Sequence, residues 1–256
     1  MENTRASASK KKFAIIPARG GSKRIPRKNV KHFCGQPMIA YAIKAARESG
    51  LFDRIIVSTD DHEIAALAVE YGAEVPFHRS KDLADDHSGI LPVIQDAIRR
   101  AGILEGCVVP IYATVPMLKG SDIRSAYLIW TRSGQGRILI PAAKYAYPVF
   151  RSFTCDDEGE AKMLFPECYG MRSQDLPEVH HDAALFYMAE ANEWLNSTAI
   201  YRKQTLVLKV NHQMVCDIDT EDDWRRAELL YNLALSDCNG SSLVPVVPGG
   251  GLMPTG

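Results

Sequence analysis

An apolar strand that runs directly into a cationic, glycine-containing loop is the feature that most limits how this chain can fold. The strand is predicted at residues 13–17, and Ala18, Gly20 and Gly21 follow it. The loop carries five cationic side chains, Arg19, Lys23, Arg24, Arg27 and Lys28. Glycines remove the Cβ atoms that would keep a ligand away from backbone N–H groups, and cations offer charge to an anion. The segment therefore predicts a polyphosphate site.

The loop matches neither of the two common phosphate-binding patterns. Gly-x-x-x-x-Gly-Lys-Ser/Thr is missing, and so is Gly-x-Gly-x-x-Gly. A run of cationic residues is most often a solvated surface turn. The position of this one favours phosphate binding, because open α/β sheets bind ligands at the carboxyl ends of their strands.

Hydrophobic periodicity over residues 13–77 predicts a β-α-β-α-β unit. Pro37 and Gly50 suit the start and stop of a helix, and a strand at 54–58 leads into a second helix capped by an aspartate of Thr59-Asp-Asp61. A third strand is expected at 73–77. The pattern predicts a Rossmann-like α/β fold, a mostly parallel sheet flanked by helices.

The rest of the chain continues this pattern with one interruption. Helices are expected at 90–98, at 121–130 with Ser121 as its cap, and after Thr220, and strands at 107–114, 137–140, 183–188 and 206–210. Residues 141–182 are irregular and predict a small excursion. We expect one domain at 13–235, a polar tail at 1–12 and a disordered Pro/Gly-rich tail at 236–256.

Composition excludes several classes of partner. The formal charge is −1 over 256 residues, so no global field favours nucleic acid or an anionic membrane. The six cysteines show no zinc spacing and are expected to be reduced. Because we find no secretory signal and no apolar stretch of membrane-spanning length, we expect a cytoplasmic protein.

Two aspartates near the end of the chain suggest a metal site. Asp217 and Asp219 bracket one residue, and in an extended segment such side chains share a face. Mg²⁺ binds few protein oxygens and completes its octahedron with phosphates and water. The alternative is helix capping, which we assign to Thr220 and the three acidic residues that follow it.

Four segments together resemble one enzyme family. They are the loop at 15–29, Ile56-Val-Ser-Thr-Asp-Asp61, Arg172-Ser-Gln-Asp-Leu-Pro177 and Asp217-Ile-Asp-Thr-Glu-Asp222. Through these segments the chain resembles the CMP-sialic acid synthetase family, the cytidylyltransferases of nonulosonic acids. The resemblance extends over about residues 13–232. The resemblance implies that the anomeric hydroxyl of a sugar acid attacks the α-phosphorus of CTP and releases pyrophosphate.

The resemblance also implies roles for particular residues. Mg²⁺ is expected on Asp217 and Asp219. The expected catalytic residues are Arg19, Lys28, Asp217 and Asp219. The expected nucleotide-binding residues are Ala18, Arg19, Gly20, Gly21, Lys23, Lys28, Arg79 and Asp86. The general base stays open between an aspartate beside the metal and a metal-bound hydroxide.

The sugar should be recognised partly through its carboxylate, which calls for an arginine. Arg151 and Arg172 are the candidates, and each could equally be a solvated surface residue. Gln174 and His181 lie in matching motifs and are also expected to contact the sugar. In the family the excursion is a dimerisation element that reaches the partner's active site, so the resemblance implies a homodimer.

Finer details are most similar to the pseudaminic acid branch of the family, including Tyr112 where the general pattern has glutamine. The chain departs from the expected strand at Ala184 and Leu185, which replace a glycine and an amide. N-acylneuraminic, legionaminic or 3-deoxy-octulosonic acid are the alternative sugars. A dinucleotide-dependent oxidoreductase and an inactive nucleotide-binding regulator are the alternative classes.

Overall fold

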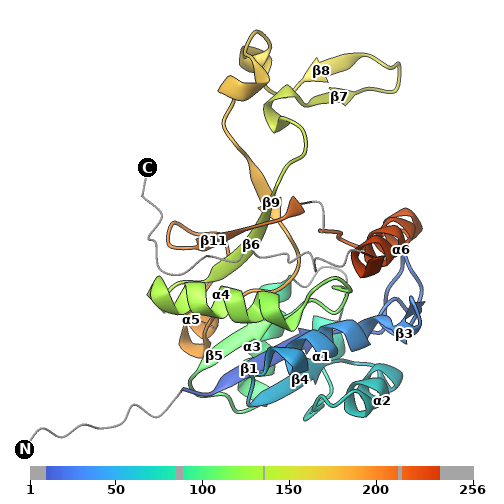
Figure 1. Ribbon diagram of the computed structural model, residues 1–256, viewed down its shortest axis with the longest axis vertical. Helices are drawn as coiled ribbons and strands as arrows, with labels where there is room; N and C mark the ends of the chain where they lie inside the picture. Colours follow the sequence, from blue (N-terminus) through green and yellow to red (C-terminus); the bar gives the residue numbers. More distant parts are fainter. Residues whose placement is uncertain (1–9, 85–88, 135, 213–214, 237–256) are drawn as a thin grey trace, which may run out of the picture.

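The computed structural model describes residues 10–84, 89–134, 136–212 and 215–236, which form an α/β body with a projecting arm (Figure 1). The body's strands are β1 (Lys12–Pro17), β2 (His32–Phe33), β3 (Gln36–Pro37), β4 (Arg54–Ser58), β5 (Cys107–Pro110), β6 (Leu139–Lys144), β9 (His180–Asp182), β10 (Ala189–Glu190) and β11 (Leu206–Val210). Its helices are α1 (Met38–Ser49), α2 (His62–Glu70), α3 (Ile90–Arg100), α4 (Gly120–Arg132), α5 (Ala191–Asn196) and α6 (Glu221–Ser236), with a 3-10 turn η1 (Lys81–Leu83).

The sheet is mostly parallel and has β1 at its centre. β1 pairs in parallel with β4 on one side and β5 on the other, and β10 pairs antiparallel with β5. A second ladder has the order β11-β6-β9, with β6 and β11 parallel. Bridges from Phe186 to Ile111 and from Met188 to Leu139 place residues 186–190 between β5 and β6. The expected Rossmann-like fold is therefore confirmed.

Helices cover both faces of this sheet. Successive residues of β1 point to opposite faces, so neighbouring side chains of the strand pack against different helices. Ile16 packs in one cluster with residues of α1, α2 and α4, whereas Ile15 packs in another with residues of α3 and α5. Both isoleucines are fully buried. Burial on both faces explains the continuous apolar run of β1.

A third cluster fastens the loop after β1 to the last helix. Ile25 from the loop and Ile218 from the segment before α6 are both fully buried in it, together with Phe33, Met38, Tyr41, Trp224 and Ala227. Phe33 and Trp224 meet edge to face, with ring centroids 5.4 Å apart. Residues almost two hundred positions apart in sequence are thereby held side by side.

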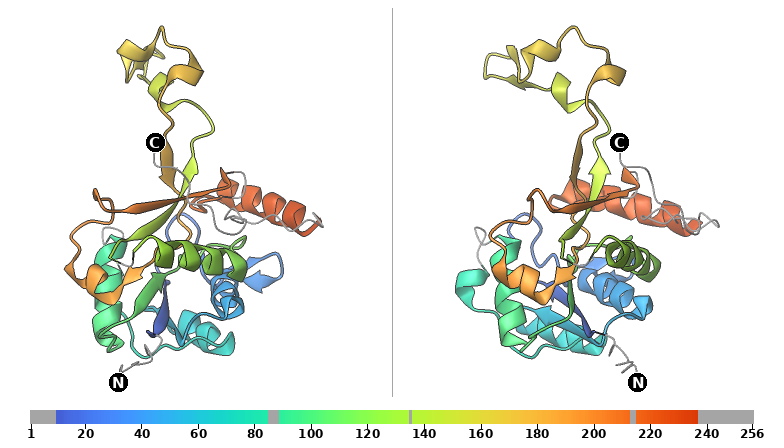
Figure 2. Two further views of the ribbon diagram at one scale, coloured as in Figure 1. Left: turned by 60° about the vertical axis from the view of Figure 1, so that its left-hand side comes forward. Right: turned by 90° about the vertical axis from the view of Figure 1, so that its left-hand side faces the viewer.

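The arm leaves the body between β6 and β9 and ends in a small hairpin (Figures 1 and 2). It contains η2 (Val149–Arg151), β7 (Phe153–Cys155), β8 (Ala161–Met163), η3 (Pro166–Cys168) and η4 (Ser173–Asp175). The excursion is thus present, but its predicted ends, 141–144 and 180–182, belong to β6 and β9.

Several local predictions are confirmed. Strands at 54–58 and 206–210 have the predicted bounds. Pro37 precedes α1 as its N-cap, and Gly50 ends the helix in the left-handed conformation at φ 63°. Asp61 caps α2 by accepting hydrogen bonds from the N–H groups of Glu63 and Ile64.

Three other predictions are corrected. The strand at 73–77 is reduced to isolated bridges at Glu74 and His78, and Pro76 between them has no N–H to donate. Ser121 is not a cap, because α4 begins at Gly120 and the Asp122 carboxylate accepts from the Lys119 N–H at 2.9 Å. The strand at 183–188 is broken at Ala184, which has φ 49°. Residues 1–9 and 237–256, most of the two predicted tails, lie outside the described residues.

Candidate active site

A pocket of about 510 Å³ opens at the carboxyl ends of β1 and β5. The chain passes from β1 to β4 on one side and returns to β5 on the other, so the sheet order switches direction here. Open α/β sheets bind ligands at such points. The lining residues with polar side chains are Arg19, Ser22, Lys23, Arg24, Lys28, Asn29, Arg79, Tyr112, Thr114 and Asp219.

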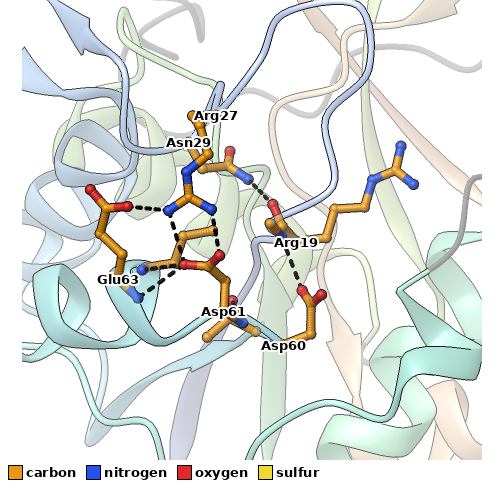
Figure 3. Close-up of polar contacts among 9 residues, drawn as sticks. Arg19, Arg27, Asn29, Asp60, Asp61 and Glu63 are labelled. Atoms are coloured by element: carbon orange, nitrogen blue, oxygen red, sulfur yellow. Dashed lines mark hydrogen bonds and ion pairs between the residues drawn. The ribbon is translucent and has the colours of Figure 1, made fainter.

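The loop after β1 is shaped by contacts with the turn after β4. The Gly20 N–H donates to Asp60 Oδ1 at 3.0 Å, and Asn29 Nδ2 donates to the Arg19 carbonyl at 2.9 Å (Figure 3). A Cβ atom at Gly20 would lie 2.7 Å from Asp61 Oδ2, whereas one at Gly21 would meet nothing within 4 Å. Close packing therefore requires a glycine at position 20 but not at position 21.

Arg27 differs from the other four cations of the loop, because it is not among the residues that line the pocket. Its guanidinium bonds the carboxylates of Asp61 and Glu63 at the start of α2, and its φ is 56°. In Figure 3 the side chains of Arg19 and Arg27 extend away from each other. Arg27 lowers the pKa of Asp61 through its hydrogen bonds. Arg27, expected to offer charge to the ligand, instead anchors the loop.

Asp219 receives two of the pocket's cations. Lys28 Nζ lies 3.2 Å from Asp219 Oδ1 and also donates to the Ile218 carbonyl at 2.7 Å. Arg24 Nη2 lies 2.8 Å from Asp219 Oδ2. The cationic loop and Asp219, one of the two predicted metal ligands, therefore meet in one pocket, whereas Asp217 is not among the residues that line it.

The Asp217 carboxyl group is suited to holding a cation. Its pKa is raised, first by partial desolvation and then by the neighbouring Asp219, although the residue as a whole is exposed. Across the part of the chain that the structure describes, no group of three or more His, Cys, Asp or Glu residues could hold a metal. Two carboxylates beside a cation-lined pocket fit Mg²⁺, whose remaining ligands would be phosphate and water.

Arg79 is buried in the wall of the pocket, directly after the short segment that bridges to β4. Its guanidinium donates to Ser58 Oγ at 3.1 Å and to the Ser58 carbonyl, and its N–H donates to the Thr59 carbonyl at 2.7 Å. Burial lowers the pKa of Arg79 to about 10, and Asp60 partly offsets this effect. The residue remains a buried cation facing the predicted nucleotide site.

Sequence reasoning singled out Tyr112 only as a branch marker, but its hydroxyl belongs to a network beside the pocket. Tyr112 Oη lies 2.8 Å from Tyr187 Oη, and Tyr187 donates to Asp182 Oδ2. Tyr201 donates to the same oxygen at 2.5 Å. The tyrosines are far apart in sequence, so no local pattern predicted their contact.

The expected sugar-binding residues are not in this pocket of the chain. Arg172 forms a two-bonded ion pair with Asp175 on the arm, and Arg151 donates to the Met171 carbonyl. Gln174 lines a hollow at the base of the arm, where Tyr145 packs against His181 with ring centroids 4.8 Å apart. Asp86 lies outside the described residues.

The fold and this pocket define a nucleotidyltransferase. A solved structure of CMP:2-keto-3-deoxy-manno-octonic acid synthetase, in complex with CTP, shares the fold with a TM-score of 0.65 over 87% of this chain and 99% of its own. Its sequence is only 15% identical. The sequence model described as Cytidylyltransferase matches residues 13–146, and the chain belongs to the cytidylyltransferase family.

Two curated relatives match over almost their whole length. The pseudaminic acid cytidylyltransferase of Campylobacter jejuni is 39% identical over 226 residues, which are 87% of this chain and 97% of the relative. The CMP-N,N'-diacetyllegionaminic acid synthase of Legionella pneumophila is 32% identical over 86% of this chain and 96% of its own. Within the described ranges, no helix is both long and apolar enough to cross a membrane.

Proposed function

We propose that this chain transfers CMP from CTP to the anomeric hydroxyl of pseudaminic acid. The observation that carries the reaction type is the meeting of Lys28 and Arg24 with Asp219 in a pocket at the switch point of the sheet. The choice of sugar is supported by the higher identity to the pseudaminic acid enzyme, 39%, than to the legionaminic acid enzyme, 32%.

In this reaction the pocket cations bind and orient the triphosphate. Arg19, Lys23 and Lys28 offer charge-assisted hydrogen bonds to phosphate oxygens. One oxygen–phosphorus bond forms at the sugar hydroxyl, the bond between the α- and β-phosphates breaks, and pyrophosphate and one proton leave. Positioning and charge neutralisation supply most of the rate enhancement of such transfers.

Mg²⁺ forms part of the proposal, with Asp217 and Asp219 as its ligands. When bound, the metal would neutralise phosphate charge and help to orient the attacking oxygen. The raised pKa of Asp217 supports this assignment, because a cation beside this carboxylate would offset the desolvation that mainly raises the pKa and also the repulsion from Asp219. Arg24 and Lys28, which contact Asp219 in this structure, would then be available to the triphosphate.

We also propose a homodimer in which the arm of one chain reaches the pocket of the other. The arm exposes large apolar side chains, including Tyr147 at 84% and Tyr169 at 79%. A dimer would cover such side chains and bring Arg151, Arg172 and Gln174 to the partner's pocket. A cytoplasmic location is proposed with it, since CTP is a cytosolic nucleotide.

Pyrophosphate release from CTP tests the reaction and the sugar together. Pseudaminic, legionaminic, N-acetylneuraminic and 3-deoxy-octulosonic acids are compared with Mg²⁺ and with the metal chelated. We expect turnover with pseudaminic acid in Mg²⁺ alone. Turnover with another acid but not with pseudaminic acid would mean that the proposed sugar is wrong. Turnover in the presence of the chelator would mean that the reaction does not need a divalent ion. If CTP is not turned over with any of the four acids, the proposed function is rejected.

A further inference from the structure

A chain of hydrogen-bonded side chains leads from the pocket wall into the protein. Tyr112 lies two residues after the end of β5, and its backbone N–H donates to the Leu185 carbonyl at 3.0 Å. Its hydroxyl contacts Tyr187, which is only 2% exposed, and Tyr187 contacts Asp182 at the end of β9. Of these three residues, Tyr112 alone lines the pocket.

The chemistry of the groups fixes the direction of each hydrogen bond. A carboxylate can only accept, so the single proton of Tyr187 is donated to Asp182. Tyr187 must then accept at its own oxygen, and the single proton of Tyr112 is the one it accepts. Burial raises the pKa of Tyr112 to about 12 and that of Tyr187 further, so both phenols keep their protons at neutral pH.

The backbone break after β9 helps to hold this arrangement. Ala184, at φ 49°, donates its N–H to Asp182 Oδ1 at 2.9 Å, while Asp182 Oδ2 accepts from Tyr187 and Tyr201. Both carboxylate oxygens are therefore engaged. Because Asp182 is fixed from three sides, the direction of the hydrogen bond between the two tyrosines is fixed as well.

We propose that Tyr112 is a specificity residue that accepts a hydrogen bond from an O–H or N–H group of the sugar acid. Tyr187 and Asp182 act as positioning residues, because they engage the Tyr112 proton and leave only its lone pairs for the pocket. The inference rests on the proposed function, since it assigns a contact to the sugar substrate of that reaction.

The surroundings of Tyr112 favour a sugar over a phosphate as the group it contacts. An anionic phosphate oxygen would be repelled by the lone pairs of the Tyr112 hydroxyl, whereas a hydroxyl or amide N–H would be attracted to them. The cations that suit phosphate lie on the loop after β1 instead.

Steady-state kinetics with Tyr112→Phe, Tyr187→Phe and the double variant test the proposal. Tyr112→Phe should reduce kcat/KM for the sugar acid about tenfold, the effect of one lost neutral hydrogen bond, and leave CTP binding unchanged by calorimetry. Tyr187→Phe should reduce the same constant by a smaller factor. The double variant should be no worse than Tyr112→Phe, because Tyr187 acts only through Tyr112.

Tyr127→Phe is the matched control, since Tyr127 is a half-buried tyrosine on α4 that does not line the pocket. Melting temperatures of all variants establish that they fold. If the two single effects multiply in the double variant, or if CTP affinity falls as much as sugar affinity, the inference is wrong while the proposed function stands. If the wild-type protein does not turn over CTP with any of the sugar acids tested, the proposed function is rejected, and the inference with it.

Discussion

Two neighbouring glycines that look equivalent in sequence have different physical roles. Gly20 packs against Asp61, forty-one positions away, and an added Cβ would lie 2.9 Å from the Asp61 Cβ. We expect Gly20→Ala to lower the free energy of unfolding by about 1–3 kcal/mol through overpacking. Gly21→Ala is the control, because its Cβ would enter open space. Urea unfolding measures both, and equal losses would contradict the assignment.

Ala184 occupies a backbone conformation that favours glycine. Its φ of 49° costs an alanine about 1 kcal/mol relative to a residue without Cβ. Ala184→Gly should therefore stabilise the protein, although glycine usually destabilises. Ala183→Gly, at a buried neighbour outside the left-handed region, should instead destabilise it. Thermal unfolding of the pair checks this, and a destabilised Ala184→Gly would refute the strain.

Asp217 should combine loss of function with a gain in stability. The pKa of Asp217 is raised in the folded state, so between its pKa values in the unfolded and folded states the folded protein binds more protons than the unfolded chain. Stability therefore falls as pH rises through the window, and Asp217→Asn escapes this loss. We expect Asp217→Asn to be more stable than wild type at neutral pH without Mg²⁺, and to lack Mg²⁺-dependent turnover.

The pH dependence of that gain separates its cause from a general effect. Below the pKa of the unfolded aspartate, about 3.9, the carboxyl group is protonated in both states, so the charge at position 217 should no longer make the free energy of unfolding differ between wild type and Asp217→Asn. Thermal scans across pH with a chelator give the comparison. A gain that persists unchanged in acid would show that it does not come from the charge of Asp217. A variant that turns over normally would show that the Asp217 carboxylate is not needed for the Mg²⁺-dependent reaction.

At the scale of elements, the third hydrophobic cluster joins the loop after β1 to the segment before α6. Ile218 is fully buried between the two aspartates, so its packing fixes where their carboxylates lie. Ile218→Ala should cost about 2–5 kcal/mol and also reduce turnover, because Asp219 loses its position beside Lys28. Ile43→Ala on α1 is equally buried but lies in another cluster.

The two isoleucine variants should therefore have similar stabilities and different activities. Both are assayed at a temperature where each is folded, as judged by circular dichroism. Equal turnover in the two variants would mean that the third cluster contributes stability alone and does not position the aspartates.

Elements with a regular period could be predicted from the sequence, and elements that depend on distant contacts could not. α1 and β4 follow from apolar periodicity and terminal Pro and Gly residues. The break at Ala184 has no local signal, because alanine rarely adopts a positive φ. In the site, the spacing of Asp217 and Asp219 was informative, whereas the anchoring role of Arg27 required its contact with Asp61.

At the scale of the whole molecule, the arm has too little core of its own to be explained as a separate unit. Its hairpin strands β7 and β8 have three residues each, and Phe153 is 62% exposed. Two short strands are marginally stable alone in water. A second copy of the chain would cover these side chains, and it would place the arm's arginines where the pocket of one chain lacks them.

Mixing two inactive variants tests this arrangement directly. Arg172→Ala removes an arm side chain that is 73% exposed, and Lys28→Ala removes a pocket cation, so neither should disturb the other's region. If the arm serves the partner's pocket, each mixed dimer has one pocket with both residues intact. Equal mixing after exchange of subunits should then restore about a quarter of wild-type turnover, while each variant alone stays low.

Mixed dimers that form, as shown by tagged co-purification, yet remain inactive would place the arm of each chain outside the partner's reaction. An Arg172→Ala protein that is fully active alone would remove the arginine from sugar binding. Asp175→Ala is the matched control, because it breaks the Arg172 ion pair on the arm and leaves the guanidinium in place for the sugar carboxylate.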